Sequence, residues 1–232
     1  MKTEIAIIIF THSLSAFAQG TFQNLDFESA NIPASTQAPS LVPISEALPG
    51  WNAYFSSGGV TYPQSQVYYD AVSLGGDVIS LDDTKEFPPL QGQYSVILFG
   101  GGNNPYYSAS ISQTGVIPSG TESLLMDAYL PAGASVTPVV AINGQPINMT
   151  PLQSFVHYTV WGGDIPAADI GQSVTLSFTE PPEPSSGAQP SIFELDNISF
   201  SAQAVPEPSP LALTGIGGLL IALYRRYAPK RQ

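Results

Sequence analysis

The chain has 232 residues, only 10% of them charged, and its 18 acidic residues outnumber six lysines and arginines to give a formal net charge of −12. So few bases cannot neutralise nucleic-acid phosphates, which excludes DNA and RNA as partners. The absence of cysteine excludes disulfides, thiolate zinc sites and cysteine nucleophiles.

The six basic residues are concentrated at the two ends of the chain. Lys85 is the only one between residues 3 and 224. Residues 19–209 therefore carry 17 acidic residues against one lysine, a formal charge of −16. Such a body is repelled by anionic lipid. We expect the ends and the body to have different roles.

Residues 1–18 predict a signal peptide. Lys2 supplies the positive start, Ile5–Phe10 is an apolar run, and Ala16 and Ala18 match a small-x-small cleavage pattern. A buried first strand is the alternative interpretation. We expect cleavage after Ala18 and export of the protein.

Residues 19–203 predict an all-β domain. Runs of five to nine residues, β-branched or aromatic at alternate positions, end at Gly, Pro, Asn or Asp. Asn143-Gly144 between two apolar runs is a strong hairpin signal. About ten strands at this spacing predict an antiparallel β-sandwich. The expected strands are Thr21–Glu28, Gln66–Val72, Val78–Leu81, Gln93–Phe99, Ala109–Thr114, Glu122–Leu130, Ser135–Ile142, Phe155–Trp161, Ser173–Thr179 and Ile192–Ser201.

Residues 204–232 predict a short membrane segment. Pro206-Glu207-Pro208 precedes the apolar run Leu211–Tyr224, and Arg225 and Arg226 follow it. As a helix this run would be about 21 Å long, shorter than the roughly 30 Å hydrocarbon core. The arginines would stay cytoplasmic and leave the acidic body outside. An ordinary single-pass anchor is the alternative interpretation.

This C-terminal pattern resembles the PEP-CTERM sorting signal. The resemblance rests on Pro206, Glu207 and Pro208, then a short glycine-containing apolar helix, then Arg225 and Arg226. It implies processing by an exosortase in a Gram-negative bacterium, with transient anchoring in the inner membrane. The body would then be released outside the cell or attached at its surface.

The body resembles the galactose-binding-like jelly roll of many carbohydrate-binding modules. The resemblance covers about Gln23–Ser201, through segments that occur in the family's order. These segments are Asn24–Glu28, Leu48–Trp51, Ser112–Thr114, Ile117–Gly120, Val140–Gly144, Val174–Phe178 and Phe193–Phe200. It implies a jelly-roll sandwich and an extracellular polysaccharide as partner.

The same resemblance implies a structural calcium site between the first and last strands. Glu28 and Asp196 fall on the family's acidic positions, and Asp26 is a third candidate ligand. Calcium binds six to eight oxygen atoms, so carboxylates and backbone carbonyls suffice. Asn197 stands where a second Asp is common in the family. The alternative is that Asp26 and Glu28 are solvated strand-edge acids and that Asp196-Asn197 forms a turn or bulge.

Aromatic and amide side chains are the candidates for sugar binding, because apolar sugar faces stack on rings and hydroxyls need polar partners. Ordinary core packing is the alternative role for each ring. The predicted contacts are Trp51, Tyr68, Tyr106, Tyr107 and Gln113, and further candidates are Tyr54, Tyr69, Trp161, Asn103 and Asn104.

Catalysis is not expected. The body contains one histidine, His157, in a predicted strand, and neither Gly-x-Ser-x-Gly nor His-Glu-x-x-His occurs. Acid pairs for glycoside hydrolysis can be drawn, but they require a particular separation in space. The sequence therefore predicts a non-catalytic protein that associates with extracellular polysaccharide or biofilm matrix. A purely structural matrix protein and a glycoside hydrolase are the alternatives.

Overall fold

The computed structural model describes residues 20–71, 79–83, 90–101, 107–133, 136–182 and 191–206. The predicted signal peptide with Ala16 and Ala18, the ligand candidate Tyr106, and the C-terminal segment from Glu207 onward, with Pro208, Arg225 and Arg226, lie outside these residues. No helix in the described part is long and apolar enough to cross a membrane.

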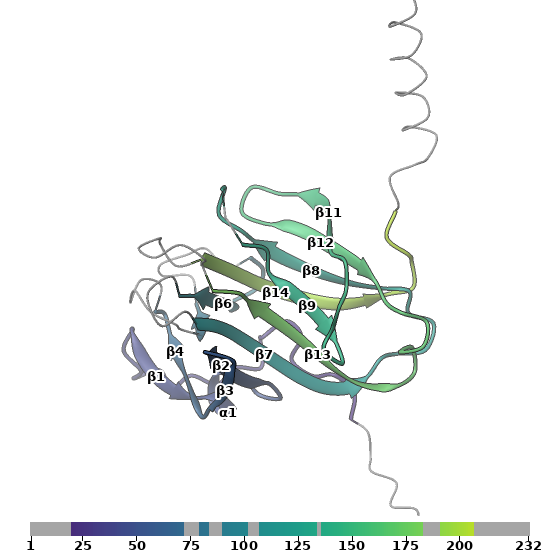
Figure 1. The fold of residues 1–232 in the computed structure, drawn as a ribbon. Helices are drawn as coiled ribbons and strands as arrows, with labels where there is room; N and C mark the ends of the chain where they lie inside the picture. The colour runs from purple at the N-terminus through teal and green to yellow at the C-terminus, as the bar shows by residue number, and fades with distance from the viewer. Residues whose placement is uncertain are drawn as a thin grey trace, which may run out of the picture.

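Two β-sheets pack face to face (Figure 1), which confirms the all-β sandwich and is compatible with a jelly roll. The eight-stranded sheet has the order β1-β4-β5-β6-β14-β8-β12-β11, and the six-stranded sheet has the order β10-β9-β13-β7-β2-β3. Only β4 and β5 run parallel among the paired strands of the described residues. In chain order the elements are β1 (Ser40–Pro43), α1 (Ile44–Ala47), β2 (Asn52–Ser57), β3 (Val60–Gln64), β4 (Gln66–Tyr69), β5 (Ile79–Asp82), β6 (Ser95–Gly100), β7 (Tyr107–Val116), β8 (Ser123–Tyr129), β9 (Val139–Ile142), β10 (Gln145–Pro146), β11 (Thr150–Ser154), β12 (Thr159–Asp164), β13 (Ser173–Glu180) and β14 (Ser191–Ser201).

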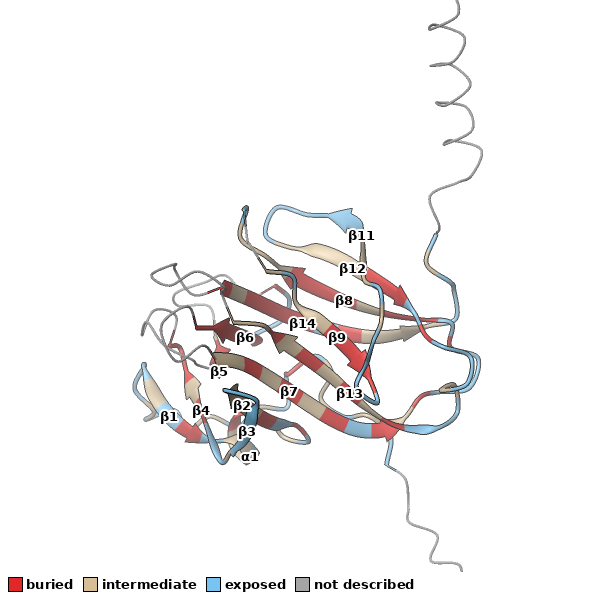
Figure 2. Cartoon of the chain, in the orientation of Figure 1, coloured by how far each residue is buried: buried red, intermediate tan, exposed pale blue. Residues whose placement is uncertain are grey.

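The hydrophobic core lies between the two sheets. In β13, Val174, Leu176 and Phe178 are buried and alternate with polar residues, as expected for a strand with one face in the core (Figure 2). The core cluster extends in sequence from Phe27 to Ile198. The core therefore joins residues from near both ends of the described part of the chain.

The Asn143-Gly144 hairpin is confirmed. These two residues join β9 to β10, and Ile142 pairs with Gln145 directly across the turn. Both loop residues have positive φ, 51° at Asn143 and 76° at Gly144. Two consecutive residues with positive φ are what a type I′ hairpin turn requires.

The predicted strand Thr21–Glu28 is wrong. Only Thr21 makes a β-bridge, to Val116, and the chain then turns. Asn24 and Phe27 have φ values of 49° and 56°, far from the extended backbone of a regular strand. The segment instead packs across one end of the sandwich, where the N–H of Ile198 donates to the carbonyl of Leu25 at 2.9 Å.

Three of the strands that the sequence did not reveal are edge strands that contain proline, whereas β2, also missed, is an interior strand without proline. β1 and β11 form the two edges of the eight-stranded sheet, and β3 forms one edge of the six-stranded sheet. They contain Pro43, Pro151 and Pro63, respectively. Proline lacks an N–H and is tolerated at edges, so it interrupts the strand pattern in sequence without excluding a strand.

Candidate functional site

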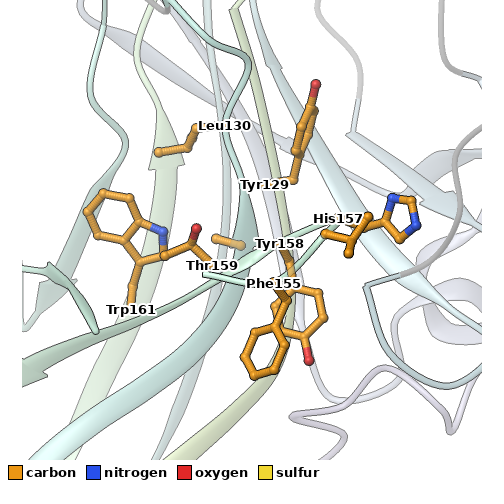
Figure 3. A pocket seen from close by; sticks show the side chains of 9 residues that line it. Tyr129, Leu130, Phe155, His157, Tyr158, Thr159 and Trp161 are labelled. Carbon is orange, nitrogen blue, oxygen red and sulfur yellow. The ribbon is translucent and has the colours of Figure 1, made fainter. Parts of the chain in front are cut away.

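An aromatic pocket lies where β8 ends and the β11–β12 hairpin turns (Figure 3). Its volume is about 180 Å³. Aromatic rings make up much of its lining, which consists of Ala128, Tyr129, Leu130, Phe155, Val156, His157, Tyr158, Thr159 and Trp161. We refer to these nine residues as the aromatic pocket.

Phe155 and Tyr158 form a stacked pair at the tip of the hairpin. Their ring centroids are 4.8 Å apart with an interplanar angle of 23°. The N–H of Phe155 donates to the carbonyl of Tyr158 at 2.8 Å, which closes the turn and holds the two rings together. Phe155 remains 46% exposed, so this apolar surface is available to a ligand.

Polar groups surround these rings. His157 is exposed, and Tyr129, Tyr158 and Thr159 are half-buried, so an imidazole and three hydroxyl groups lie around one small hollow. None of the nine lining residues is Asp or Glu. The pocket therefore offers stacking surfaces and hydrogen-bonding groups, but no carboxylate for acid–base chemistry among them.

The loop at residues 90–94 connects this pocket to buried acids. The backbone N–H of Gln91 donates to Asp196 Oδ2 at 2.9 Å, and its side-chain Nε2 donates to the Tyr158 hydroxyl at 2.5 Å. Glu28 Oε1 accepts the N–H groups of Gln93 at 2.7 Å and Tyr94 at 3.0 Å. Two of the three predicted metal ligands, Glu28 and Asp196, thus hold the same loop.

The carboxyl groups near this loop destabilise one another as anions. Burial, together with the charges of Glu28 and Asp127, raises the pKa of Asp196 to about 8, although N–H groups of Asn197 and Gln91 oppose the shift. Burial likewise raises the pKa of Asp127, against a hydrogen bond from Asn197. The described residues contain no lysine or arginine to balance these acids.

The fit of this region to calcium is partial. Glu28 and Asp196 could each supply carboxylate oxygens, and a cation would relieve their repulsion. Asp26 is exposed, and its Oδ1 accepts the N–H of Glu28 at 3.3 Å within the N-terminal turn. Among the described residues, no three Asp, Glu, His or Cys side chains form a group that could hold a metal. Backbone carbonyls and water would have to supply the remaining ligands.

A second group of acids is buried on the outer face of the eight-stranded sheet. Burial, a hydrogen bond with Asp70 and the charges of Asp70 and Glu194 raise the pKa of Asp82 to about 8. Burial raises the pKa of Glu194 to about 7, against a hydrogen bond at 2.6 Å from the Ser95 hydroxyl. None of these acids is among the nine residues that line the aromatic pocket, although Glu194 pairs across β14 and β8 with Tyr129, which is.

Trp51 belongs to the core, which corrects its assignment as a ligand contact. Its side chain is only 4% exposed, and its ring packs between Phe27 and Phe178 with centroid distances of 5.6 and 6.0 Å. Its Nε1 donates to the carbonyl of Asn24 at 2.9 Å. A ring enclosed on both faces offers no surface to a sugar.

Gln113 also has a structural partner. Its buried amide accepts the N–H of Gln23 at 2.5 Å and donates to the carbonyl of Gln23 at 2.9 Å, which fastens the N-terminal segment to β7. Tyr68 lies on β4 of the eight-stranded sheet and packs against Ile97 and Phe99. Tyr107 begins β7 in the other sheet. The predicted ligand contacts within the described residues therefore do not gather in one place.

The aromatic pocket was largely missed by the sequence analysis. Of its rings only Trp161 was a candidate, because Phe155–Trp161 was predicted to be one continuous strand. The chain instead turns between Phe155 and Tyr158 without Gly, Pro, Asn or Asp. The one available signal was the number of aromatic residues between Phe155 and Trp161. So many rings in seven residues indicate a role beyond core packing.

Comparison with known proteins shows similarity in shape alone. No family model matches the chain, and no curated protein matches it. The solved structure of a cyclase from Fischerella sp. TAU is similar at 12% identity and a TM-score of 0.43, covering 82% of this chain and 98% of the cyclase. A β-glucosidase from Kluyveromyces marxianus is similar at 16% identity and a TM-score of 0.33, covering 88% of this chain and 22% of that enzyme. Similarity at this level does not indicate function.

Proposed function

We propose that this protein is a non-catalytic polysaccharide-binding protein, with the aromatic pocket as its binding site. The observation that carries the proposal is the stacked pair of Phe155 and Tyr158, whose exposed Phe155 ring lies in a pocket also lined by Trp161 and hydroxyl groups. An apolar sugar face stacks on such rings, while the sugar hydroxyls bind the polar groups around them.

The charge of the body restricts the glycan. The described residues contain no lysine or arginine, so no fixed cation is available there to attract an anionic polysaccharide. The body as a whole carries a formal charge of −16 over residues 19–209, which repels uronate and sulfate groups. We therefore propose neutral glycans as the ligands.

We further propose that calcium binds at Glu28 and Asp196 as a structural ion. The basis is that two acids from opposite ends of the chain hold the loop at residues 90–94, and that the charge of Glu28 raises the pKa of Asp196. Bound calcium would relieve the repulsion between Glu28 and Asp196, which is otherwise relieved by a proton on Asp196. The ion would stabilise the loop that contacts Tyr158.

The proposed location is outside the cell. The basis is the sequence pattern of the signal peptide and the PEP-CTERM-like C-terminus, with an exosortase as the processing partner and the membrane contacted only through the C-terminal segment before processing. Cell fractionation of the native bacterium, with and without Arg225 and Arg226 replaced by alanine, tests this location. Retention of the mature body in the cytoplasm would contradict it.

A glycan array with residues 20–206 tests binding, followed by affinity electrophoresis in gels that contain the polysaccharides that bind. Phe155→Ala should abolish most of the retardation. Tyr62→Ala, which removes a ring that is 50% exposed on edge strand β3 of the other sheet, is the matched control and should bind normally. Absence of binding to any glycan, with and without calcium, would leave a structural matrix protein as the better interpretation.

A further inference from the structure

A second cavity adjoins the aromatic pocket on the inner face of the eight-stranded sheet. Its volume is about 130 Å³, and Leu130 and Trp161 line both hollows. Met126 pairs directly with Trp161 across β8 and β12, and Ala128 pairs with Thr159, so these four side chains share one face of the sheet. The two hollows therefore lie next to each other along that face.

The floor and the mouth of this cavity differ in chemistry. Met126 and Phe193, 4% and 0% exposed, form an apolar floor that belongs to the core. Thr137 and Asn148 are exposed and supply the polar groups at the mouth. No charged residue is among the ten that line it. Such a cavity disfavours a sugar ring, whose hydroxyls would lose water without gaining partners.

The cavity has the size of a six-carbon apolar group. Apolar protein cavities of roughly 150 Å³ bind benzene, and this one measures about 130 Å³. Trp161 and Leu130 line both hollows, so a group carried on a sugar in the aromatic pocket would reach the cavity past these two side chains. Figure 3 shows Trp161 and Leu130 together on one side of the aromatic pocket, toward which such a group would project.

We propose that this cavity is an apolar subsite for a phenyl-sized substituent of the bound glycan. The ligand class is then a neutral sugar that carries an aryl or short branched alkyl group, rather than an unsubstituted polysaccharide alone. This inference rests on the proposed glycan binding at the aromatic pocket, and it adds a preference among glycans that stacking on Phe155 and Tyr158 does not provide.

Calorimetric titration of residues 20–206 tests the subsite. The probes are the methyl and phenyl β-D-glucopyranosides and galactopyranosides, with benzyl alcohol as an apolar probe without sugar. We expect the phenyl glycoside of the accepted sugar to bind at least about tenfold more tightly than the methyl glycoside, because the phenyl ring leaves water. The larger side chain in Thr137→Trp should fill the mouth of the second cavity. The preference for the phenyl glycoside should then disappear, while the methyl glycoside still binds.

Gln145→Trp is the matched control, since Gln145 is exposed on β10 and does not line the cavity. Equal affinity for phenyl and methyl glycosides, or an unchanged preference in Thr137→Trp, would overturn the subsite and leave glycan binding intact. Binding of benzyl alcohol that Thr137→Trp blocks, without binding of any glycoside, would overturn the proposed function and with it the class of ligand. Thermal unfolding of both variants verifies that each one folds.

Discussion

Gln91 is hydrogen-bonded to Tyr158, its side-chain Nε2 donating to the tyrosine hydroxyl at 2.5 Å, across 67 positions of sequence. The backbone N–H of the same glutamine donates to Asp196. One residue therefore connects the buried acids to the rim of the aromatic pocket. Whatever holds or releases the loop at residues 90–94 also acts on the position of the Tyr158 ring.

We expect Gln91→Ala to weaken polysaccharide binding several-fold, because Tyr158 loses the bond that orients it against Phe155. Gln93→Ala is the control, since its side-chain amide bonds to Tyr94 and not to the pocket. Affinity electrophoresis measures the effect, and unfolding temperatures show that both variants are folded. Equal retardation of the two variants would show that the Gln91 bond is irrelevant to binding.

Calcium should raise the unfolding temperature of residues 20–206, and more so at pH 8 than at pH 5. Protons occupy Asp196 at the lower pH, since its pKa is about 8, and they compete with the ion. The gain is roughly 2.7 kcal/mol when free calcium exceeds its Kd by about a hundredfold. Scanning calorimetry with EGTA and with added calcium measures it. Asp196→Asn should lose the response, and an unchanged midpoint in the parent protein would remove the calcium proposal.

Asp82 should make the protein less stable as the pH rises. Its pKa is raised from 3.8 to about 8, so across this interval the folded protein holds a proton that the unfolded chain releases. Its contribution to the free energy of unfolding therefore falls from about pH 4 to about pH 8 and is constant above that. We expect Asp82→Asn, which is neutral at every pH, to be more stable than the parent at pH 8 and similar to it at pH 4.

Urea denaturation at several pH values tests this expectation. The control is Glu122→Gln, which removes an exposed acid and should leave the pH dependence as it is in the parent protein. A parallel pH dependence in Asp82→Asn and the parent would show that the buried proton is not at Asp82.

Gln113→Ala should destabilise the protein by about 1–3 kcal/mol, because it leaves the backbone N–H and carbonyl of Gln23 without partners. Glycan binding should be unaffected, since Gln113 is not part of the aromatic pocket. Thr114→Ala is the control, as it removes only an exposed hydroxyl pair with Thr175. Loss of binding without loss of stability would restore Gln113 as a ligand contact.

The sequence predicted the sandwich because alternation of apolar and polar residues, as in β13, is a local pattern that survives into the fold. It failed at Thr21–Glu28, where positive φ at Asn24 and Phe27 converts an apparent strand into a turn. The aromatic pocket was missed for a related reason. A turn without turn residues, at Phe155–Tyr158, carries no local signal, and the pairing of Tyr158 with Gln91 depends on a contact remote in sequence.

The predicted metal ligands, in contrast, were named from the sequence although they lie far apart in the chain. Glu28 and Asp196 lie 168 positions apart in the chain, and they were brought together in the sequence analysis only through the resemblance to carbohydrate-binding modules. In the structure both accept backbone hydrogen bonds from the same loop, residues 90–94. The sequence alone could not show whether Trp51 is a core residue or a ligand contact. A tryptophan at the end of a sandwich has the same sequence pattern around it whether its ring faces the core or the solvent.

The last described residues have a mechanical consequence. The N–H of Val205 donates to Asp164 at 2.7 Å, at the end of β12, and Thr159 and Trp161 of that strand line the aromatic pocket. In a protein tethered through the segment that follows Pro206 and holding polysaccharide at the hairpin, tension between tether and ligand would be carried by β14, which leads into that segment, and by the Val205–Asp164 hydrogen bond to β12. β14 lies between β6 and β8 in the eight-stranded sheet, so a pull from the matrix would be shared by the interior strands of this sheet.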